Sequence, residues 1–572
     1  SVSLAELSPE RCQVLPGGDV TISVQVTLPD GHSGRGKLFL DVNGKAMEHP
    51  LESTSISIVG MPKGVHSVIF RAEDEGGRTL AQTKPLWFST DGDQFSLDVA
   101  TAREQNPYKS AALLAELYRC TVVHTSTVSA RVWVLLSQAR EYATALHYVR
   151  LVVANAPGEA SFHAYLACAL WLHAYGMGGE VACDAGTACS REVTDAFVRA
   201  MELGMKSVEA GGVINEMAGI EDPYTENDLG LALKAALLRA ECVFNRKQSG
   251  TPVHTLPAGD PCVEDAWPYK CVVIYARQYL EELNEPWGPA KLAQGMGGAN
   301  EAVIFMSREL ARRGYVVRVY GNPAKEEIGI DAFGVEWRSF WEYDEGNRPG
   351  VFVVWWHHQD AVFMGRKARS RFMWFHYRQY TQRYTKQFMR RIEGAFAMSR
   401  YHAQQMPEYA RNKTIVSGNG IDPAFFADGS NDPHTLIYAS HPFYGLKTLL
   451  KAWPSIYSRI PEAHLEVYYG WTPGMIRHME RVGAQGLAFK EDVDRMLQSE
   501  GVVSKGMVGQ RQLSEALSNS GFYVYPCEIA EISSISLMRA QAMGSIPITS
   551  RHMDSALNET AGFYDLGPPA RR

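Results

Sequence analysis

The spacing of apolar side chains changes along this chain, and the first pattern is an alternation with period two. It runs through residues 20–26, 37–42 and 67–72, and Gly-rich turns such as Asn43-Gly44 and Gly76-Gly77 separate these stretches. Alternation of this kind is typical of strands that bury one face. We therefore predict a small antiparallel β-sandwich over residues 1–95. It has no converging polar cluster, which favours a packing or recognition role without chemistry.

Helical spacing replaces the alternation between about residues 100 and 250. Apolar positions in 130–149 and in 162–171 fit two helices, and Ala156-Pro157 lies between them as a short turn. The pair resembles a tetratricopeptide-type hairpin, so we predict an α-helical TPR-like module over 100–250. Bracing a neighbouring domain and binding a protein partner are both open as roles for such a module.

A third pattern starts after a stretch of turn residues at 251–268, which we predict to be a linker. The apolar run 270–275 suits a buried parallel strand, and the loop around Gly297 and Gly298 leads into a helix that Gly314 ends. Residues 316–321 supply the next strand. This strand, helix and strand predict an α/β domain over 269–425.

The same kind of unit recurs over 430–572. Strand patterns lie at 436–440 and 465–470, and residues 527–548 fit a strand, a turn, a helix and a second strand. We therefore predict two Rossmann-like lobes, the second of which begins near residue 430.

Composition and charge restrict the function. Apolar residues make up 45% and charged residues 21%, and no apolar run reaches the ~18 to 20 residues of a membrane helix. The net charge of −7 argues against a general nucleic-acid surface. One basic run, Arg366 to Arg371, fits a solvated helix face or, as the less favoured reading, a polyanion site.

The nine cysteines show no metal-ligand spacing, so we expect no zinc site. Cys262 with Cys271, or Cys183 with Cys189, suits a disulfide in an oxidising compartment. The odd total fits reduced thiols equally well. The sequence does not decide between the cytoplasm and the secretory pathway. The sequons at Asn412 and Asn558 are compatible with glycosylation in the secretory pathway.

Candidate chemistry gathers in the turn of the 527–548 segment. Glu531 lies in the turn, and Ser533, Ser534 and Ile535 stand where the helix begins. Unpaired N–H groups and the helix dipole favour anions at a helix N-terminus. The absent side chains of Gly297 and Gly298 would also let a phosphate or sugar approach the backbone.

This segment resembles the donor-binding segment of family-4 retaining glycosyltransferases, which have the GT-B fold. Their pattern is Glu, seven residues, a second Glu, and a small-residue helix that ends in Gly-x-x-Pro. Glu531 matches the first Glu, Arg539 stands at the second, and Gly544 and Pro547 match the end. The run 297–320 is similar to the first βαβ unit of GT-B enzymes, and 419–422 reads as their Asn-Gly-Ile-Asp hinge. The resemblance covers about residues 270–565.

The resemblance implies roles for these residues. Glu531 would orient hydroxyls of the donor sugar, and Arg539 would lie at the ribose, although a guanidinium cannot accept hydrogen bonds from it. Ser440 and Lys505 would also bind the donor, with Lys505 as a replacement cation because Tyr444 stands where the family has Arg or Lys.

The histidines after two predicted strands differ in their expected roles. His376 matches a family histidine and is predicted to contact the ligand, whereas core packing is favoured for His357 and His358. The family also continues past its last strand with further helices, so we expect the second lobe to be incomplete at Arg572.

The sequence therefore predicts a retaining glycosyltransferase that moves a sugar from a nucleotide-sugar donor to a hydroxyl of a glycan, protein or lipid. No metal and no cofactor beyond the donor are expected, because helix termini and cations would serve the diphosphate. A catalytically degenerate scaffold that binds partners through the helical module is the alternative, and a phosphorylase or hydrolase is a third. The donor base, the sugar and the acceptor do not follow from the residues.

Overall fold

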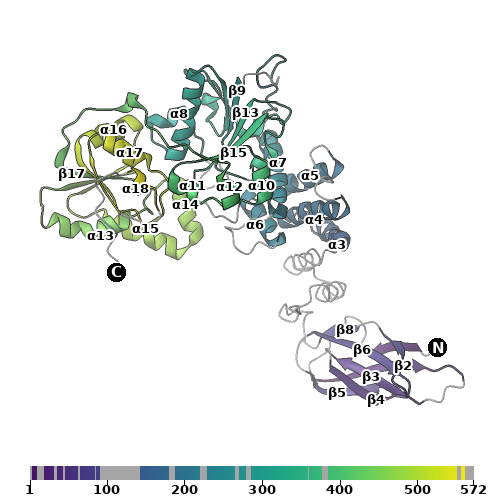
Figure 1. The fold of residues 1–572 in the computed structure, drawn as a ribbon. Helices are drawn as coiled ribbons and strands as arrows, with labels where there is room; N and C mark the ends of the chain where they lie inside the picture. Colours follow the sequence, from purple (N-terminus) through teal and green to yellow (C-terminus); the bar gives the residue numbers. More distant parts are fainter. Residues whose placement is uncertain are drawn as a thin grey trace. The chain divides into compact units, whose positions relative to one another are not determined.

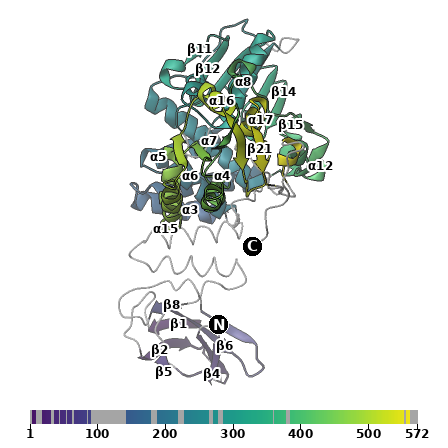
Figure 2. The ribbon, with the colours of Figure 1, turned by 90° about the vertical axis from the view of Figure 1, so that its left-hand side faces the viewer.

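The computed structural model places most of the chain in two compact units, Ser1–Leu203 and Gly204–Arg572, which we describe separately (Figures 1 and 2). It describes residues 3–8, 18–30, 35–42, 45–53, 55–61, 65–83, 86–89, 142–178, 187–218, 228–263, 270–277, 285–358, 360–376, 384–550 and 555–560. The predicted helical stretch before residue 142 lies outside these ranges.

The strands of the first unit form two antiparallel sheets, β1-β2-β5 and β4-β3-β6-β7 with β8 beside β6. The strands are β1 (Ser3–Ser8), β2 (Gly18–Thr27), β3 (Lys37–Val42), β4 (Lys45–Pro50), β5 (Ser55–Met61), β6 (Val65–Glu73), β7 (Thr79–Gln82) and β8 (Leu86–Ser89). Alternate residues such as Ile22 and Val24 of β2 and Leu38 and Leu40 of β3 are fully buried. They belong to one apolar cluster that side chains of both sheets fill.

Three helices follow in the same unit: α3 (Tyr142–Asn155), α4 (Ala160–Gly178) and α5 (Ala188–Glu202). The predicted helix pair with a turn at Ala156-Pro157 is confirmed by α3 and α4. Thr187 caps α5 by accepting a hydrogen bond from the Ser190 N–H at 3.1 Å.

The second unit contains the first of two α/β lobes, which we call the first lobe. Its eight-stranded sheet has the order β11-β12-β10-β9-β13-β14-β15-β16 and is parallel except for the edge strand β11. The strands are β9 (Cys271–Tyr275), β10 (Val316–Gly321), β11 (Gly329–Ile330), β12 (Val335–Ser339), β13 (Val351–Trp355), β14 (Ser370–Trp374), β15 (Gly394–Ala397) and β16 (Thr414–Val416).

Helices cover both faces of this sheet because its strands are apolar on both sides. Val272 and Ile274 of β9 pack with side chains of α8, whereas Val273 and Tyr275 pack with side chains of α7. Figure 1 shows α7 and α8 on opposite sides of the sheet. The helices of this part of the chain are α6 (Ser207–Met217), α7 (Asp228–Ser249), α8 (Gly298–Arg312), α9 (Asp360–Phe363), α10 (Lys386–Arg390), α11 (Arg400–Gln404) and α12 (Glu408–Arg411). Helix α6 packs on α7.

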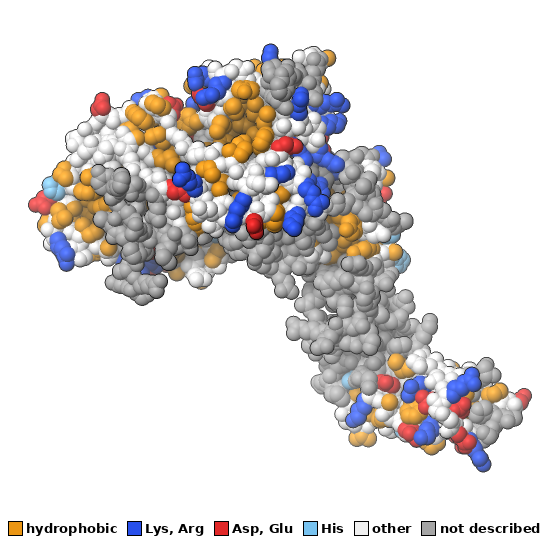
Figure 3. Space-filling view, in the orientation of Figure 1, with side chains coloured by type: hydrophobic (Ala, Val, Ile, Leu, Met, Phe, Trp, Pro, Cys, Tyr) orange, Lys and Arg blue, Asp and Glu red, His pale blue; other side chains and the backbone are white. Residues whose placement is uncertain are grey.

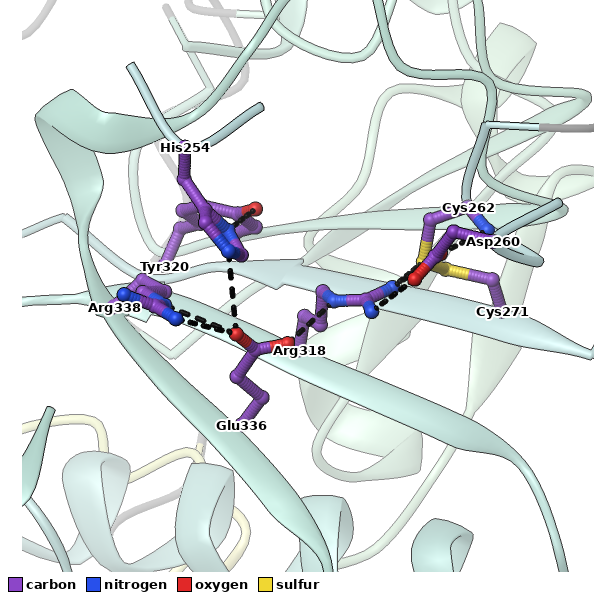
Figure 4. Close-up of polar contacts among 8 residues, drawn as sticks. All are labelled: His254, Asp260, Cys262, Cys271, Arg318, Tyr320, Glu336 and Arg338. Atoms are coloured by element: carbon purple, nitrogen blue, oxygen red, sulfur yellow. Dashed lines mark hydrogen bonds and ion pairs between the residues drawn. A yellow bond between two sulfur atoms is a disulfide. The ribbon is translucent and has the colours of Figure 1, made fainter. Parts of the chain in front are cut away.

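The segment before β9 is fixed to this sheet by charge and by a disulfide (Figure 4). Arg318 of β10 pairs with Asp260 at 2.6 Å and with Glu336 of β12 at 2.6 Å. A Cys262–Cys271 disulfide joins the segment to the first residue of β9, which confirms one of the two predicted pairings. Neutralising Arg318 from two sides makes its near-complete burial tolerable.

His254 completes this network at the neighbouring strand. Its Nδ1 lies 3.1 Å from the Tyr320 hydroxyl and its Nε2 lies 3.4 Å from Glu336. Burial lowers the pKa of His254, and the cation of Arg338 adds to that shift. A neutral imidazole therefore makes these contacts at neutral pH as a hydrogen-bonding group.

The second lobe has a five-stranded parallel sheet with the order β19-β18-β17-β20-β21. Its elements are β17 (Asp432–Ala439), α13 (Leu446–Tyr457), β18 (His464–Tyr468), α14 (Pro473–Val482), α15 (Ala484–Met496), β19 (Val502–Gly506), α16 (Gln510–Ser518), β20 (Ser520–Tyr525), α17 (Ile535–Ala542), β21 (Ile546–Thr549) and α18 (Leu557–Thr560). The two parallel sheets with their helices confirm the predicted Rossmann-like lobes. Among the described residues, no helix is long and apolar enough to cross a membrane.

Gly445 provides a test of the second lobe's packing. It precedes α13 with a φ of 105°, and a Cβ there would lie 2.0 Å from the carbonyl oxygen of Pro526. We expect Gly445→Ala to lower the free energy of unfolding by about 3 kcal/mol or more, because backbone strain and a backbone clash add.

Gly204→Ala is the matched control, since Gly204 has a φ of 98° and open space around its Cβ position. Gly204→Ala should lower the free energy of unfolding by about 1 kcal/mol, because backbone strain is its only cost. Urea unfolding of both variants measures the difference, and equal losses would refute the predicted contact with Pro526.

Candidate functional site

The loops at the carboxyl ends of the two parallel sheets meet in the second unit. Asn419, which follows β16, donates a hydrogen bond from Nδ2 to the Ser533 hydroxyl at 2.9 Å. Ile532 packs into the first lobe's apolar cluster beside Trp355 and Trp374. In parallel α/β sheets, ligands bind beyond the carboxyl ends of the strands. These loops are therefore the candidate site.

The predicted glycine loop lies at this junction. Gly297 precedes α8 without a side-chain cap, so the first N–H groups of the helix have no side-chain acceptor from the cap position. A Cβ on Gly298 would lie 3.1 Å from Cδ1 of Ile535. Gly298 and Ile535 are thus brought together, and the missing side chain lets the starts of α8 and α17 approach each other.

Of the elements predicted within 527–548, the turn, the helix and the second strand are present as residues 526–534, α17 and β21. The first strand was placed too late in the chain, because β20 ends at Tyr525. Ser534 is the N-cap of α17, and its hydroxyl accepts a hydrogen bond from the Leu537 N–H at 3.3 Å. Ser533 is half-buried one residue earlier and contacts Asn419. The two serines therefore define the start of α17 but have different partners.

Glu531 is held in a fixed orientation in this turn. Its Oε2 accepts a hydrogen bond from the Tyr525 hydroxyl at 2.8 Å, and its Oε1 accepts from the N–H groups of Ile532 and Ser533 at 2.9 and 3.2 Å. The Glu531 carbonyl also accepts from the Ala556 N–H at 2.7 Å. A carboxylate with these partners is positioned in advance as a hydrogen-bond acceptor.

His376 lies two residues after the end of β14 in the first lobe. Its ring is 4.6 Å from that of Trp374, edge to face, and 6.0 Å from that of Trp355. Burial, with a smaller contribution from His402, lowers the pKa of His376 to about 3. Its Nε2 is buried and has no hydrogen-bond partner in the described part of the chain. A neutral imidazole with an unpartnered nitrogen suits a ligand hydroxyl.

The neighbouring histidines differ from His376. His358 is fully buried, with its ring 5.4 Å from Tyr384 and 5.7 Å from Phe388. That environment agrees with the core role expected for it. His357 is half-buried beside Trp356, and its backbone N–H bonds to the carbonyl of Trp355.

Two bulky residues have left-handed backbone conformations at this edge. Trp356 directly follows β13 with a φ of 69°, and Tyr469 directly follows β18 with a φ of 88°. Such residues cost of order 1–3 kcal/mol each and cluster at functional sites. Sequence reasoning missed both, because nothing in local composition signals a Trp or Tyr with positive φ.

Arg539 of α17 in the second lobe pairs with a carboxylate of the first lobe. Its guanidinium forms an ion pair with Oε1 of Glu301 in the first turn of α8, and both side chains are almost completely buried. Gln510 of α16 donates a hydrogen bond to Oε2 of the same carboxylate at 2.9 Å. Burial raises the pKa of Glu301, and Arg539 opposes that shift. The residue at the expected ribose position therefore joins the lobes.

Lys505, the expected replacement cation, and the nearby Lys447 are also paired. Lys505 lies within β19, and its Nζ is 2.9 Å from Glu466 of the adjacent strand. Lys447 of α13 pairs with Asp492 at 2.8 Å. These lysines and Arg539 therefore have carboxylate partners inside the molecule, so none of them presents an uncompensated charge.

The turn after β17 contains uncharged groups. Ser440 is half-buried at the end of the strand. Tyr444 stacks on His441, with ring centroids 4.8 Å apart. Burial lowers the pKa of His441 to about 4, so its imidazole is neutral at pH 7. Among the described residues, no cluster of three metal-ligating side chains is present.

No protein-family model matches this chain, and no curated protein is similar to it in sequence. Among solved structures it is similar to sucrose-phosphate synthase from Thermosynechococcus elongatus, with 14% identity and a TM-score of 0.39 over 53% of this chain and 86% of that one. The Anabaena protein HepE in complex with UDP-glucose has 10% identity and a TM-score of 0.38 over 52% and 85%.

An O-GlcNAc transferase mutant from Thermobaculum terrenum has 14% identity and a TM-score of 0.31 over 82% of this chain and 85% of that one. Likeness at these identities and TM-scores does not assign a function to this chain.

The neutral state of His376 predicts a pH dependence of stability. Its pKa falls from an ordinary value of 6.5 to about 3 on folding, so the unfolded chain binds the proton more readily. Stability should therefore fall as the pH drops below 6.5, by about 2 kcal/mol at pH 5 from this group. Urea unfolding at pH 8 and pH 5 should show a smaller loss for His376→Gln than for the wild type. An equal loss in both proteins would contradict a buried neutral His376.

The Glu301–Arg539 pair predicts strong coupling. Arg539→Met should cost about 3–5 kcal/mol, because it leaves the buried Glu301 carboxylate without its cation. The double variant Glu301→Leu with Arg539→Met removes both charges and should cost less than Arg539→Met alone. Unfolding free energies of the single and double variants test this, and additive costs would show that the two residues do not interact.

Proposed function

We propose that this protein transfers a sugar from a nucleotide-sugar donor to a hydroxyl group of a glycan, protein or lipid acceptor, with retention of anomeric configuration. The main support is the carboxylate of Glu531, which Tyr525 and two backbone amides orient at the junction of two parallel α/β lobes. Retention follows from the resemblance of residues 527–548 to family-4 glycosyltransferases.

In this proposal the chemistry is the departure of a nucleoside diphosphate from the anomeric carbon. Negative charge grows on the diphosphate as an oxocarbenium-like centre forms. N–H groups at the start of α17, after Ser533 and Ser534, would stabilise that charge more in the transition state than in the ground state. No metal is needed for this role.

The other residues would position the sugar. Glu531 would accept hydrogen bonds from donor-sugar hydroxyls, and the uncharged imidazole of His376 would bond to a sugar hydroxyl without introducing a charge. The acceptor would enter beside the carboxyl ends of β13 and β14, where Trp356 is strained.

A second candidate, a scaffold with a degenerate site, is favoured by one observation. Arg539, Lys447 and Lys505 are each paired with a carboxylate of the protein, and Tyr444 replaces the usual cation. A site without an available cation would bind a diphosphate weakly. Donor binding therefore separates the two candidates.

We expect one of the UDP-, GDP- or dTDP-linked sugars to bind, as measured by isothermal titration calorimetry. Glu531→Gln should weaken that binding about 10- to 100-fold, the value of a hydrogen bond to a charged group. It should leave binding of the free nucleoside diphosphate unchanged, because the carboxylate is assigned to the sugar.

Glu528→Gln is the matched control, because Glu528 is an exposed carboxylate of the same turn. It should bind the donor like the wild type. Failure of every donor to bind would favour the scaffold. Binding that Glu531→Gln leaves unchanged would refute the role assigned to Glu531.

A further inference from the structure

Positive charge is concentrated in one part of this acidic protein. Residues 366–413 contain twelve Lys and Arg side chains but only two carboxylates, Glu393 and Glu408, in a chain whose net charge is −7. Ten of the twelve cations belong to the described residues. We call the surface formed by these ten the basic face.

The fold gathers this segment around one edge of the first lobe's sheet. The guanidinium of Arg371, at the start of β14, donates to the carbonyls of Ala361 and Arg391. Lys413, just before β16, donates to the carbonyls of Met389 and Ile392 at 2.9 and 2.8 Å. Figure 3 shows Lys and Arg side chains over the region that Figure 1 labels α10 and α12.

The basic face lies mainly at the amino ends of β14, β15 and β16. Arg366 to Arg369 precede β14, Arg390 and Arg391 precede β15, and Lys413 precedes β16. His376 and the candidate site lie at the carboxyl ends of these parallel strands, the opposite edge of the sheet. The cations at the amino ends are therefore separate from the proposed donor site, whereas Arg400 of the basic face follows the carboxyl end of β15.

Several of these cations are available to a partner. Lys367, Lys386 and Arg390 are exposed, and none of the three forms an ion pair within the described ranges. Burial, together with Arg366 and Arg391, lowers the pKa of Arg371, while Glu393 opposes the shift. Like charges are thus held close together with few carboxylates to offset them.

Apolar side chains are exposed beside the cations. Tyr409 of α12 is 40% exposed, and Ile415 and Val416 of the edge strand β16 are each 48% exposed. The Lys386 ammonium lies 5.8 Å from the centre of the Tyr409 ring. Cations intermixed with aromatic and aliphatic side chains suit the boundary between phospholipid headgroups and acyl chains.

We propose that the basic face binds the surface of an anionic lipid bilayer. Its cations would bind phospholipid phosphates, and Tyr409, Ile415 and Val416 would enter the headgroup layer. The remainder of the chain, which is strongly acidic, would be repelled by the same surface, so the molecule would bind through this face. A nucleic acid shares the phosphate chemistry but offers no apolar layer for β16.

Vesicle co-sedimentation of the whole chain tests the proposal. The protein should bind phosphatidylcholine vesicles that contain phosphatidylglycerol, should not bind pure phosphatidylcholine, and should dissociate at high salt. Lys367→Gln, Lys386→Gln and Arg390→Gln combined should weaken binding about 100-fold, at about fivefold for each cation.

The matched control replaces three exposed cations outside the basic face, Lys325→Gln, Lys451→Gln and Arg459→Gln. It removes the same charge and should reduce binding only slightly. Equal losses in both triple variants would overturn the proposal, because they would show that net charge alone decides binding.

A double variant distinguishes a lipid bilayer from other polyanions. Ile415→Ser with Val416→Ser should weaken binding to phosphatidylglycerol vesicles and leave retention on heparin unchanged. Failure of the wild type to bind these vesicles, with binding to single-stranded RNA or heparin instead, would overturn the assignment to a membrane. No donor is present in these assays, so their outcome is independent of the proposed glycosyl transfer.

Discussion

A single buried carboxylate, that of Glu301, connects the two lobes at the candidate site. Arg539 pairs with one of its oxygens and Gln510 donates to the other, so elements of both lobes share one desolvated charge. Removing a charge from water is costly, and it is tolerated only when the partner geometry is maintained. The close approach of Gly298 to Ile535 and the contact of Asn419 with Ser533 lie at the same junction. The positions of Glu531 and His376 relative to each other depend on this connection.

Among the described residues of the second unit, charged side chains are paired at the candidate site but partly unpaired and exposed at the amino edge of the first lobe's sheet. At the candidate site the polar groups are neutral or paired: burial keeps His376 and His441 uncharged, and the nearby cations are bound to carboxylates. At the amino edge of the first lobe, cations outnumber carboxylates and several are exposed. The proposed chemistry therefore relies on oriented dipoles, whereas the proposed membrane contact relies on net charge.

Helices and strands whose apolar residues and caps lie close together in the sequence could be predicted from local patterns. Helix α17 and strand β21 form where residues 527–548 predicted a helix and a second strand, because their apolar residues and the N-cap serine lie close together in the sequence. The first strand of this unit ends at Tyr525, before the range predicted for it. The basic run at Arg366 was expected on a helix but lies in a turn. Helix α9 ends at Phe363, and Gly365 follows with a φ of 65° and its Cβ position against the ring of Phe352. The partner of Arg539 lies 238 residues away, and no local pattern contains that information.

The most direct measurement of the central claim is hydrogen–deuterium exchange with and without UDP-, GDP- and dTDP-linked sugars. If the junction of the lobes is a donor site, one donor will slow exchange in peptides that cover 526–540 and 295–303, and it will leave those of the first unit unchanged. Binding of a donor without protection of either peptide would place the site elsewhere. If no donor slows exchange in any peptide, the result would contradict a donor site and favour the alternative that the two lobes are a scaffold.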